Sequence, residues 1–138
     1  MATNTVGGKG REFHTQQVHY LRRTINWNTA GVATGASLGF LPAGAQVIQS
    51  NVIVKTAWNG SAATLTVGTN SSSYNNIHSG MTQTQTALTV NYVGTAGAVG
   101  VTLTQDTEVF VKVVNGATTA PSAGQAICIL SYAPNNDQ

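Results

Sequence analysis

Few side chains in this sequence could perform acid–base chemistry. The acidic residues are Glu12, Asp106, Glu108 and Asp137, and of these Asp106 and Glu108 alone lie close together in the sequence. Paired carboxyl groups act as general acid and base when a cleft holds them and shifts their pKa values apart. Asp106 and Glu108 instead mark the start of an expected strand, so we interpret them as a solvated rim.

The histidines and the cysteine are the remaining candidates for metal binding or nucleophilic chemistry. His14 and His19 are separated by five residues, which places them on opposite faces of a strand and does not suit a shared metal ion. Cys128 lies in the apolar run AICILSY and is expected to be a buried small hydrophobic residue. The sequence contains no Gly-x-Ser-x-Gly nucleophile motif. We therefore expect no enzymatic activity, no metal site and no cofactor.

The N-terminal region is predicted to be an extended arm. Met1–Phe13 is polar and rich in glycine and has no hydrophobic periodicity, as is typical of flexible terminal segments. The run Gly7–Gly10 lacks the spacing of a phosphate-binding loop. We therefore divide the chain into an arm over residues 1–13 and a β-sandwich domain over residues 14–138.

Cations are concentrated in and just after this arm, which leaves three interpretations open. These cations are Lys9, Arg11, Arg22 and Arg23. Together with the aromatic residues Phe13, Tyr20 and Trp27 they could contact nucleic acid through phosphates and base stacking. They could equally dock on an acidic protein surface or remain solvated. The net charge of +2 is small and gives little support for nucleic acid as a partner, so we favour protein docking. The expected docking residues are Lys9, Arg11, Phe13, Arg22 and Arg23.

Strand signals recur along the chain, whereas helix signals are nearly absent. Apolar residues alternate with polar ones in about eight short runs, separated by turns rich in Gly, Asn, Pro and Ser. The expected strands cover residues 16–27, 36–41, 52–58, 61–67, 87–93, 99–103, 109–113 and 126–132. Regularly spaced short strands of this kind predict an all-β antiparallel sandwich or barrel.

The stretch VKTAWNGSAATLTVG is predicted to form a β-hairpin. Asn59-Gly60 favours a two-residue type I′ turn, which requires positive φ angles. In the resulting register Val54 lies opposite Leu65, and the apolar residues gather on one face. Trp58 shares that face and either caps the end of the core or offers an exposed contact. The predicted core residues are Val52, Val54, Leu65, Val67, Val90, Val101, Leu103, Val111, Val113 and Leu130.

Asn70–Gln85 is predicted to be a long polar loop. It reads NSSSYNNIHSGMTQTQ and contains apolar or amphipathic groups, including Met81, that a simple linker does not need. Long loops in compact domains are usually functional or mobile. The possible contact residues of the loops are Trp58, Tyr74, Ile77 and His78.

Composition indicates an assembly component rather than a membrane or secreted protein. Only 7% of the residues are charged, against about 25% in ordinary soluble domains, and such a surface suits packing against other protein. The segment MATNTVGGKG has no apolar run of the kind found in signal peptides. No stretch approaches the roughly 20 apolar residues that a membrane span requires.

Several short motifs mark turns and strand starts. They are LPAGA at 41–45, AWNG at 57–60, LTVG at 65–68, GQA at 124–126 and Tyr-Ala-Pro at 132–134. This succession resembles the small all-β virion proteins of tailed double-stranded DNA bacteriophages. Among these it looks most like the capsid cement, or decoration, proteins. The resemblance covers residues 41–134.

The resemblance implies a jelly-roll-like antiparallel β-sandwich of about eight strands with an extended N-terminal arm. It also implies a protein made in the host cytoplasm that binds the outer surface of the phage head. There it would bridge neighbouring major capsid subunits and stabilise the shell, as a dimer or trimer, without binding nucleic acid or membrane. The family has no catalytic motif to carry over.

A tail or fibre domain is the alternative function. In that case Trp58, Tyr74 and His78 would form an aromatic patch on the loops that recognises a host glycan or receptor. The same short motifs could occur in tail and fibre components, so the sequence leaves this alternative open.

Overall fold

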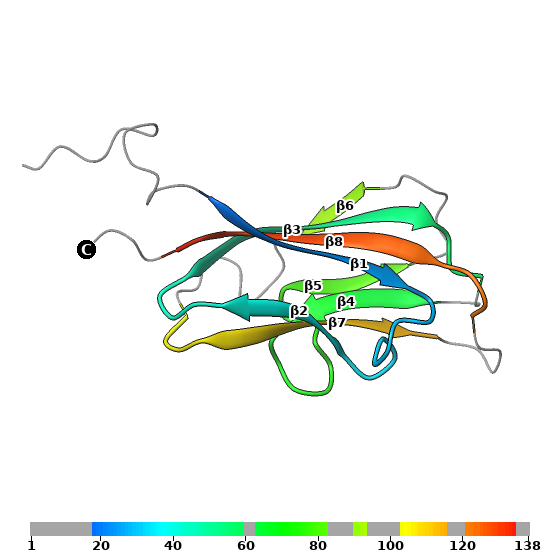
Figure 1. Ribbon diagram of the computed structural model, residues 1–138, viewed down its shortest axis with the longest axis horizontal. Coiled ribbons are helices and arrows are strands. Elements are labelled where there is room, and N and C mark those ends of the chain that lie inside the picture. The colour runs from blue at the N-terminus through cyan, green and yellow to red at the C-terminus, as the bar shows by residue number, and fades with distance from the viewer. Residues whose placement is uncertain (1–17, 60–62, 83–89, 94–102, 116–120, 135–138) are drawn as a thin grey trace, which may run out of the picture.

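Two four-stranded antiparallel sheets stack face to face in the computed structural model (Figure 1). The structure describes residues 18–59, 63–82, 90–93, 103–115 and 121–134. Every strand pair in both sheets is antiparallel. Within the described ranges there is no helix long and apolar enough to cross a membrane.

The strand order is that of a jelly roll. One sheet has the order β1-β8-β3-β6 and the other β2-β7-β4-β5, the arrangement of eight strands in two interlocked Greek keys. The first sheet contains β1 (His19–Asn26), β8 (Gln125–Ala133), β3 (Gln46–Thr56) and β6 (Val90–Val93). The second contains β2 (Ala36–Leu41), β7 (Thr107–Val114), β4 (Thr64–Gly68) and β5 (His78–Thr82). The fold class predicted from the sequence is confirmed.

Alternation along each strand produces the core between the sheets. In β8 the side chains of Ala126, Cys128 and Leu130 are buried, while Ile127 and Ile129 between them are half-buried on the outer face. Successive side chains of a strand point to opposite faces, so the apolar positions of the two sheets meet in one layer. The predicted core residues found buried there are Val52, Val54, Leu65, Val67, Val111, Val113 and Leu130. Leu103 is partly buried against them. Val101 and the side chain of Val90 are not among the parts of the chain that the structure describes.

The predicted hairpin over residues 54–68 is wrong. Its first strand, β3, belongs to one sheet and its second, β4, to the other. Val54 pairs with Ala126 of β8, whereas Leu65 pairs with Val113 of β7. Alternation shows that one face of each strand is buried, but two strands with matching patterns can lie side by side or oppose each other across the core. Here they oppose each other, and the chain crosses between sheets.

Replacing Leu130 with alanine should test the central layer. Leu130 is fully buried, so Leu130→Ala is expected to lower the free energy of unfolding by about 2–5 kcal/mol through lost burial and a residual cavity. Chemical denaturation measures the change. The matched control is Ile129→Ala on the outer face of the same strand, which should cost clearly less. Equal costs would contradict the assignment of faces.

Candidate functional site

The predicted docking residues divide into two groups. Lys9, Arg11 and Phe13 lie outside the described residues, so their role stays a prediction. Arg22 is exposed on β1, in register with Ile129 of β8 on the outer face of that sheet. It is therefore accessible for a contact.

Arg23 has a structural role within the sandwich. It is half-buried and in register with Cys128, so it lies on the inward face of β1. Its guanidinium group donates a hydrogen bond to the backbone carbonyl of Ser37 on β2. Arg23 thus links the edge strands of the two sheets, and this interaction competes with the predicted docking role.

Asp106 makes a structural hydrogen bond, and Cys128 is buried in the core. The carboxylate of Asp106 accepts a hydrogen bond from the backbone N–H of Ala43 at 2.9 Å and is otherwise exposed. Burial raises the pKa of the Cys128 thiol to about 12, so the thiol stays protonated and unreactive at neutral pH. In the described part of the chain no group of three or more His, Cys, Asp or Glu side chains could hold a metal ion.

Trp58 closes one end of the core. Its side chain is 3% exposed, and its indole packs directly on Gly124, where an added Cβ would come within 2.3 Å of the ring. The core-capping interpretation of Trp58 therefore fits its burial, and an exposed loop contact does not. The indole Nε1 is buried and has no hydrogen-bond partner among the described residues.

Asn59 anchors the loop that precedes β8, which corrects the turn role predicted for it. Its Oδ1 accepts hydrogen bonds from the backbone N–H groups of Ser122 at 2.8 Å and Ala123 at 3.1 Å. Its Nδ2 donates to the Ser122 hydroxyl at 2.7 Å. Among the described non-glycine residues, positive φ angles occur at Ser72 and Tyr74 and not at Asn59. The side chain of Asn59 matters here through its hydrogen bonds.

The predicted long polar loop is shorter than expected. It ends at Ile77, because β5 begins at His78. Two asparagines brace what remains: Asn70 Oδ1 accepts from the backbone N–H of Asn75 at 2.9 Å, and Asn76 Oδ1 accepts from that of Thr69 at 2.8 Å. Side-chain amides thus replace the backbone pairing that a strand would supply.

Of the loop contacts predicted from the sequence, Tyr74 alone remains near the surface. Ile77 and His78 are fully buried, so the folded chain does not present them to a partner. Tyr74 is half-buried and its ring centroid lies 4.7 Å from that of Phe110 on β7. Its ring also leaves no room for a side chain at Gly35. Tyr74 therefore fastens the loop to the outer face of the second sheet.

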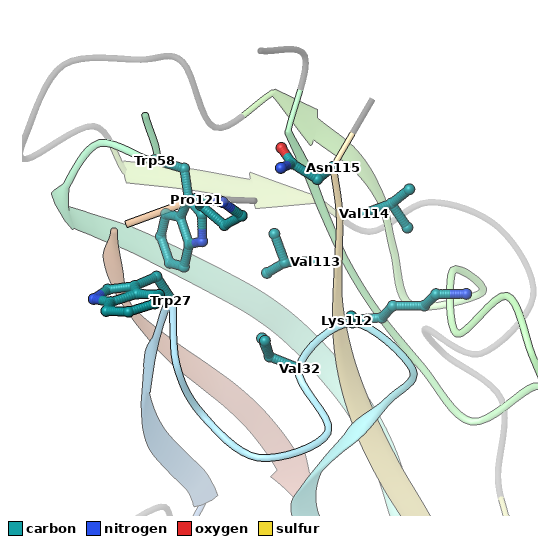
Figure 2. A pocket seen from close by; sticks show the side chains of 9 residues that line it. Trp27, Val32, Trp58, Lys112, Val113, Val114, Asn115 and Pro121 are labelled. Atoms are coloured by element: carbon teal, nitrogen blue, oxygen red, sulfur yellow. The ribbon is translucent and has the colours of Figure 1, made fainter. Parts of the chain in front are cut away.

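A mostly apolar pocket of about 550 Å³ lies at the end of the sandwich beside Trp58 (Figure 2). We call it the tryptophan pocket. Its lining residues are Trp27, Val32, Ala33, Trp58, Lys112, Val113, Val114, Asn115 and Pro121. The amino group of Lys112 donates to the carbonyl of Ser72 at 2.7 Å, so its charge is engaged outside the pocket. Volumes of this size are typical of ligand sites.

The sequence did not predict that Trp27 and Trp58 lie near each other. Trp27 follows β1 and Trp58 follows β3, and both strands pair antiparallel with β8. The strands β1 and β3 therefore run in the same direction, and their C-terminal ends lie at the same end of the sheet. The signal that could have found the pocket is the strand order, which no local pattern contains.

A second candidate surface is the outer face of the sheet β1-β8-β3-β6. Register places Ile127 beside Ile53, with Ile129 two residues farther along β8. All three side chains are half-buried although they point away from the core. Around them lie mainly amides and hydroxyls, and Arg22 is the charged residue in register with Ile129. An apolar centre with few charges and an arginine at its edge is typical of protein interfaces.

Comparison of the fold with solved structures gives three matches from phage capsids. A chain in the capsid asymmetric unit of cyanophage Pam1 aligns with a TM-score of 0.70 and 21% identity, covering 97% of this chain and 96% of that chain. The fold is one found in phage capsids. A chain in the capsid of Ralstonia phage GP4 aligns with a TM-score of 0.63 and 25% identity, covering 86% and 85% of the two chains.

The third match is a chain in the acid-stable capsid of Helicobacter pylori bacteriophage KHP30. Its TM-score is 0.57 at 13% identity, covering 86% of this chain and 89% of that chain. No protein-family model and no curated protein matches the sequence. The similarity to these chains is therefore clear in the fold and weak in the sequence.

Replacing Asn59 should destabilise the end of the sandwich. Asn59→Gly would be tolerated if the residue served a positive-φ turn, because glycine adopts that conformation most easily. Three hydrogen bonds are lost at an exposed position where water can replace part of them. We therefore expect a loss of about 1 kcal/mol in the free energy of unfolding. Chemical denaturation would measure it. Asn59→Asp, which keeps the acceptor, is the control and should cost less.

Acid should destabilise the fold through His78. Burial lowers the pKa of His78 from 6.5, and neither ring nitrogen has a hydrogen-bond partner among the described residues. As the pH falls below 6.5, His78 gains a proton in the unfolded chain but not in the folded chain. The free energy of unfolding therefore decreases as the pH falls, until the pH reaches the pKa of His78 in the folded state. Chemical denaturation measured above and below pH 6.5 should show this decrease in the free energy of unfolding. His78→Leu should reduce it, and an unchanged pH dependence would contradict the assignment.

Proposed function

We propose that this chain is a capsid cement, or decoration, protein of a tailed phage. It binds the outer surface of the head, bridges neighbouring major capsid subunits and stabilises the shell without enzymatic activity. The partners are the major capsid protein and further copies of the chain, as a dimer or trimer. Nucleic acid and membrane are not partners in this proposal.

The observation that carries the proposal is the extent of the match to the capsid chain of cyanophage Pam1. It covers nearly all of both chains, so the counterpart is itself a small sandwich rather than one domain of a larger subunit. A small, sparsely charged jelly roll suits an accessory position on a shell, where many weak contacts act together.

The outer face of the sheet β1-β8-β3-β6 is our candidate for the shell contact. Its centre, Ile53, Ile127 and Ile129, is apolar. Arg22 on the same face offers a bidentate donor for a carboxylate of the partner. The arm residues Lys9, Arg11 and Phe13 would add a second, extended contact to a neighbouring subunit.

A tail or fibre domain that binds a glycan would need a different surface. Sugar recognition combines an aromatic platform with several polar groups that fix orientation. The predicted patch of Trp58, Tyr74 and His78 does not assemble, because Trp58 and His78 are buried. The geometry therefore favours the shell role over the glycan-binding role.

A charge at the centre of the candidate face should prevent attachment to phage heads. Ile129→Glu is expected to weaken binding to purified heads about tenfold, because it places a carboxylate in the apolar centre and pairs with its cross-strand neighbour Arg22, which then no longer serves the partner. Sedimentation of the chain with heads measures occupancy. Thr64→Glu on the outer face of the opposite sheet is the matched control and should leave occupancy unchanged.

Two results would contradict the proposal. Full occupancy of heads by folded Ile129→Glu would exclude this face as the contact. The cement role would be excluded if the chain were located only at one vertex or in the tail. In that case its copy number would not scale with that of the major capsid protein. Glycan binding by the isolated chain would then support the tail or fibre alternative.

A further inference from the structure

The tryptophan pocket contains a buried donor that nothing described in the fold satisfies. Trp58 is 3% exposed, and its Nε1 has no hydrogen-bond partner among the described residues. Figure 2 shows this nitrogen on the side of the indole that faces Val113, within the pocket. A buried N–H group without an acceptor is unfavourable, so an occupant that brings an acceptor removes that penalty on binding.

The lining selects the chemistry of the occupant. Trp27, 41% exposed, forms one wall, and Pro121 and Val113 form others. These surfaces suit a large apolar side chain, and aromatic rings pack well against tryptophan. The buried N–H donor of Trp58 suits a carbonyl placed beside that side chain. An extended peptide segment with an aromatic residue supplies both groups.

The N-terminal arm contains such a residue. Phe13 is the one phenylalanine, tyrosine or tryptophan in the first 17 residues. Those residues precede β1, which begins at His19. The chain thus supplies a polar segment carrying an isolated aromatic side chain with backbone carbonyls on both sides.

Geometry favours the arm of another copy over the arm of the same chain. Trp27 follows the eight-residue strand β1, which at about 3.3 Å per residue spans about 26 Å. Phe13 lies six residues before His19, so a fully extended chain carries it about 20–22 Å at most. A reversal of direction would shorten that reach further. Phe13 of the same chain therefore falls short of the pocket.

We propose that the tryptophan pocket binds Phe13 of the arm of a second copy of this chain. The phenyl ring packs between Trp27, Pro121 and Val113, and a backbone carbonyl next to it accepts the hydrogen bond from Trp58 Nε1. The arm emerges at one end of β1 and the pocket lies at the other, so the contact is head-to-tail. Such contacts close into rings when the rotation between copies permits. This inference does not depend on attachment to a capsid.

Association of the purified full-length chain tests the proposal. Sedimentation across a dilution series should show oligomers for the wild type, and both Phe13→Ala and Trp27→Ala should weaken association about tenfold or more, as at an anchoring interface residue. Phe40→Ala is the matched control, because Phe40 is also an exposed aromatic residue, 62% exposed, but lies on β2 away from the pocket. It should leave association unchanged.

Mixing the two variants distinguishes exchange between copies from binding within one chain. Phe13→Ala keeps an intact pocket and Trp27→Ala keeps an intact arm, so their equimolar mixture should regain association that neither has alone. A synthetic peptide of residues 7–17 should compete with it, and the same peptide with alanine in place of Phe13 should not.

Three outcomes would overturn the inference. The first is a wild-type chain that stays monomeric and does not bind the peptide. The second is a Phe13→Ala chain that associates as the wild type does. The third is a mixture of variants that regains nothing. Because Phe13 lies in the arm, Phe13→Ala remains informative even if Trp27→Ala proves unstable.

Discussion

The pairing of β8 with two partners is the constraint on which the rest of the structure depends. β8 lies between β1 and β3, and both neighbours run antiparallel to it. That single arrangement places Ala126, Cys128 and Leu130 in the core and Ile127 and Ile129 on the opposite face. It also brings the ends of β1 and β3 together, and with them the two tryptophans. The core, the candidate shell contact and the tryptophan pocket are three results of one strand's position.

Much of the fold could be predicted from the sequence, because alternation depends on local residue order alone. The runs around Ala36–Leu41, Val109–Val113 and Ala126–Tyr132 predicted strands that the structure contains, and most of the predicted core is buried. Partner choice between strands is not local. The Val54 and Leu65 patterns match each other well, yet the strands lie in opposite sheets, because facing layers and neighbouring strands require the same alternation.

The candidate site was harder to predict, and Asn59 and His78 show why. An Asn-Gly pair between two apolar runs is a strong turn signal, but Asn59 uses its amide to hold a loop more than sixty residues farther along the chain. His78 lies in a polar stretch that gives no sign of burial, yet β5 carries it into the interior. In a chain with so few charges, uncharged polar residues occur both inside and outside, so polarity says little about exposure.

The central position of β8 also has a consequence for the time course of folding. It is the last described strand to leave the ribosome, and β1, the first, has no partner in its sheet until β8 arrives. The pairing of His19 with Tyr132 closes more than a hundred residues of intervening chain. Closing long loops before contacts form slows folding, and strand edges stay exposed to other chains meanwhile. Completion of this sandwich therefore waits for its last described strand, and until then pairing of β1 competes with misassociation.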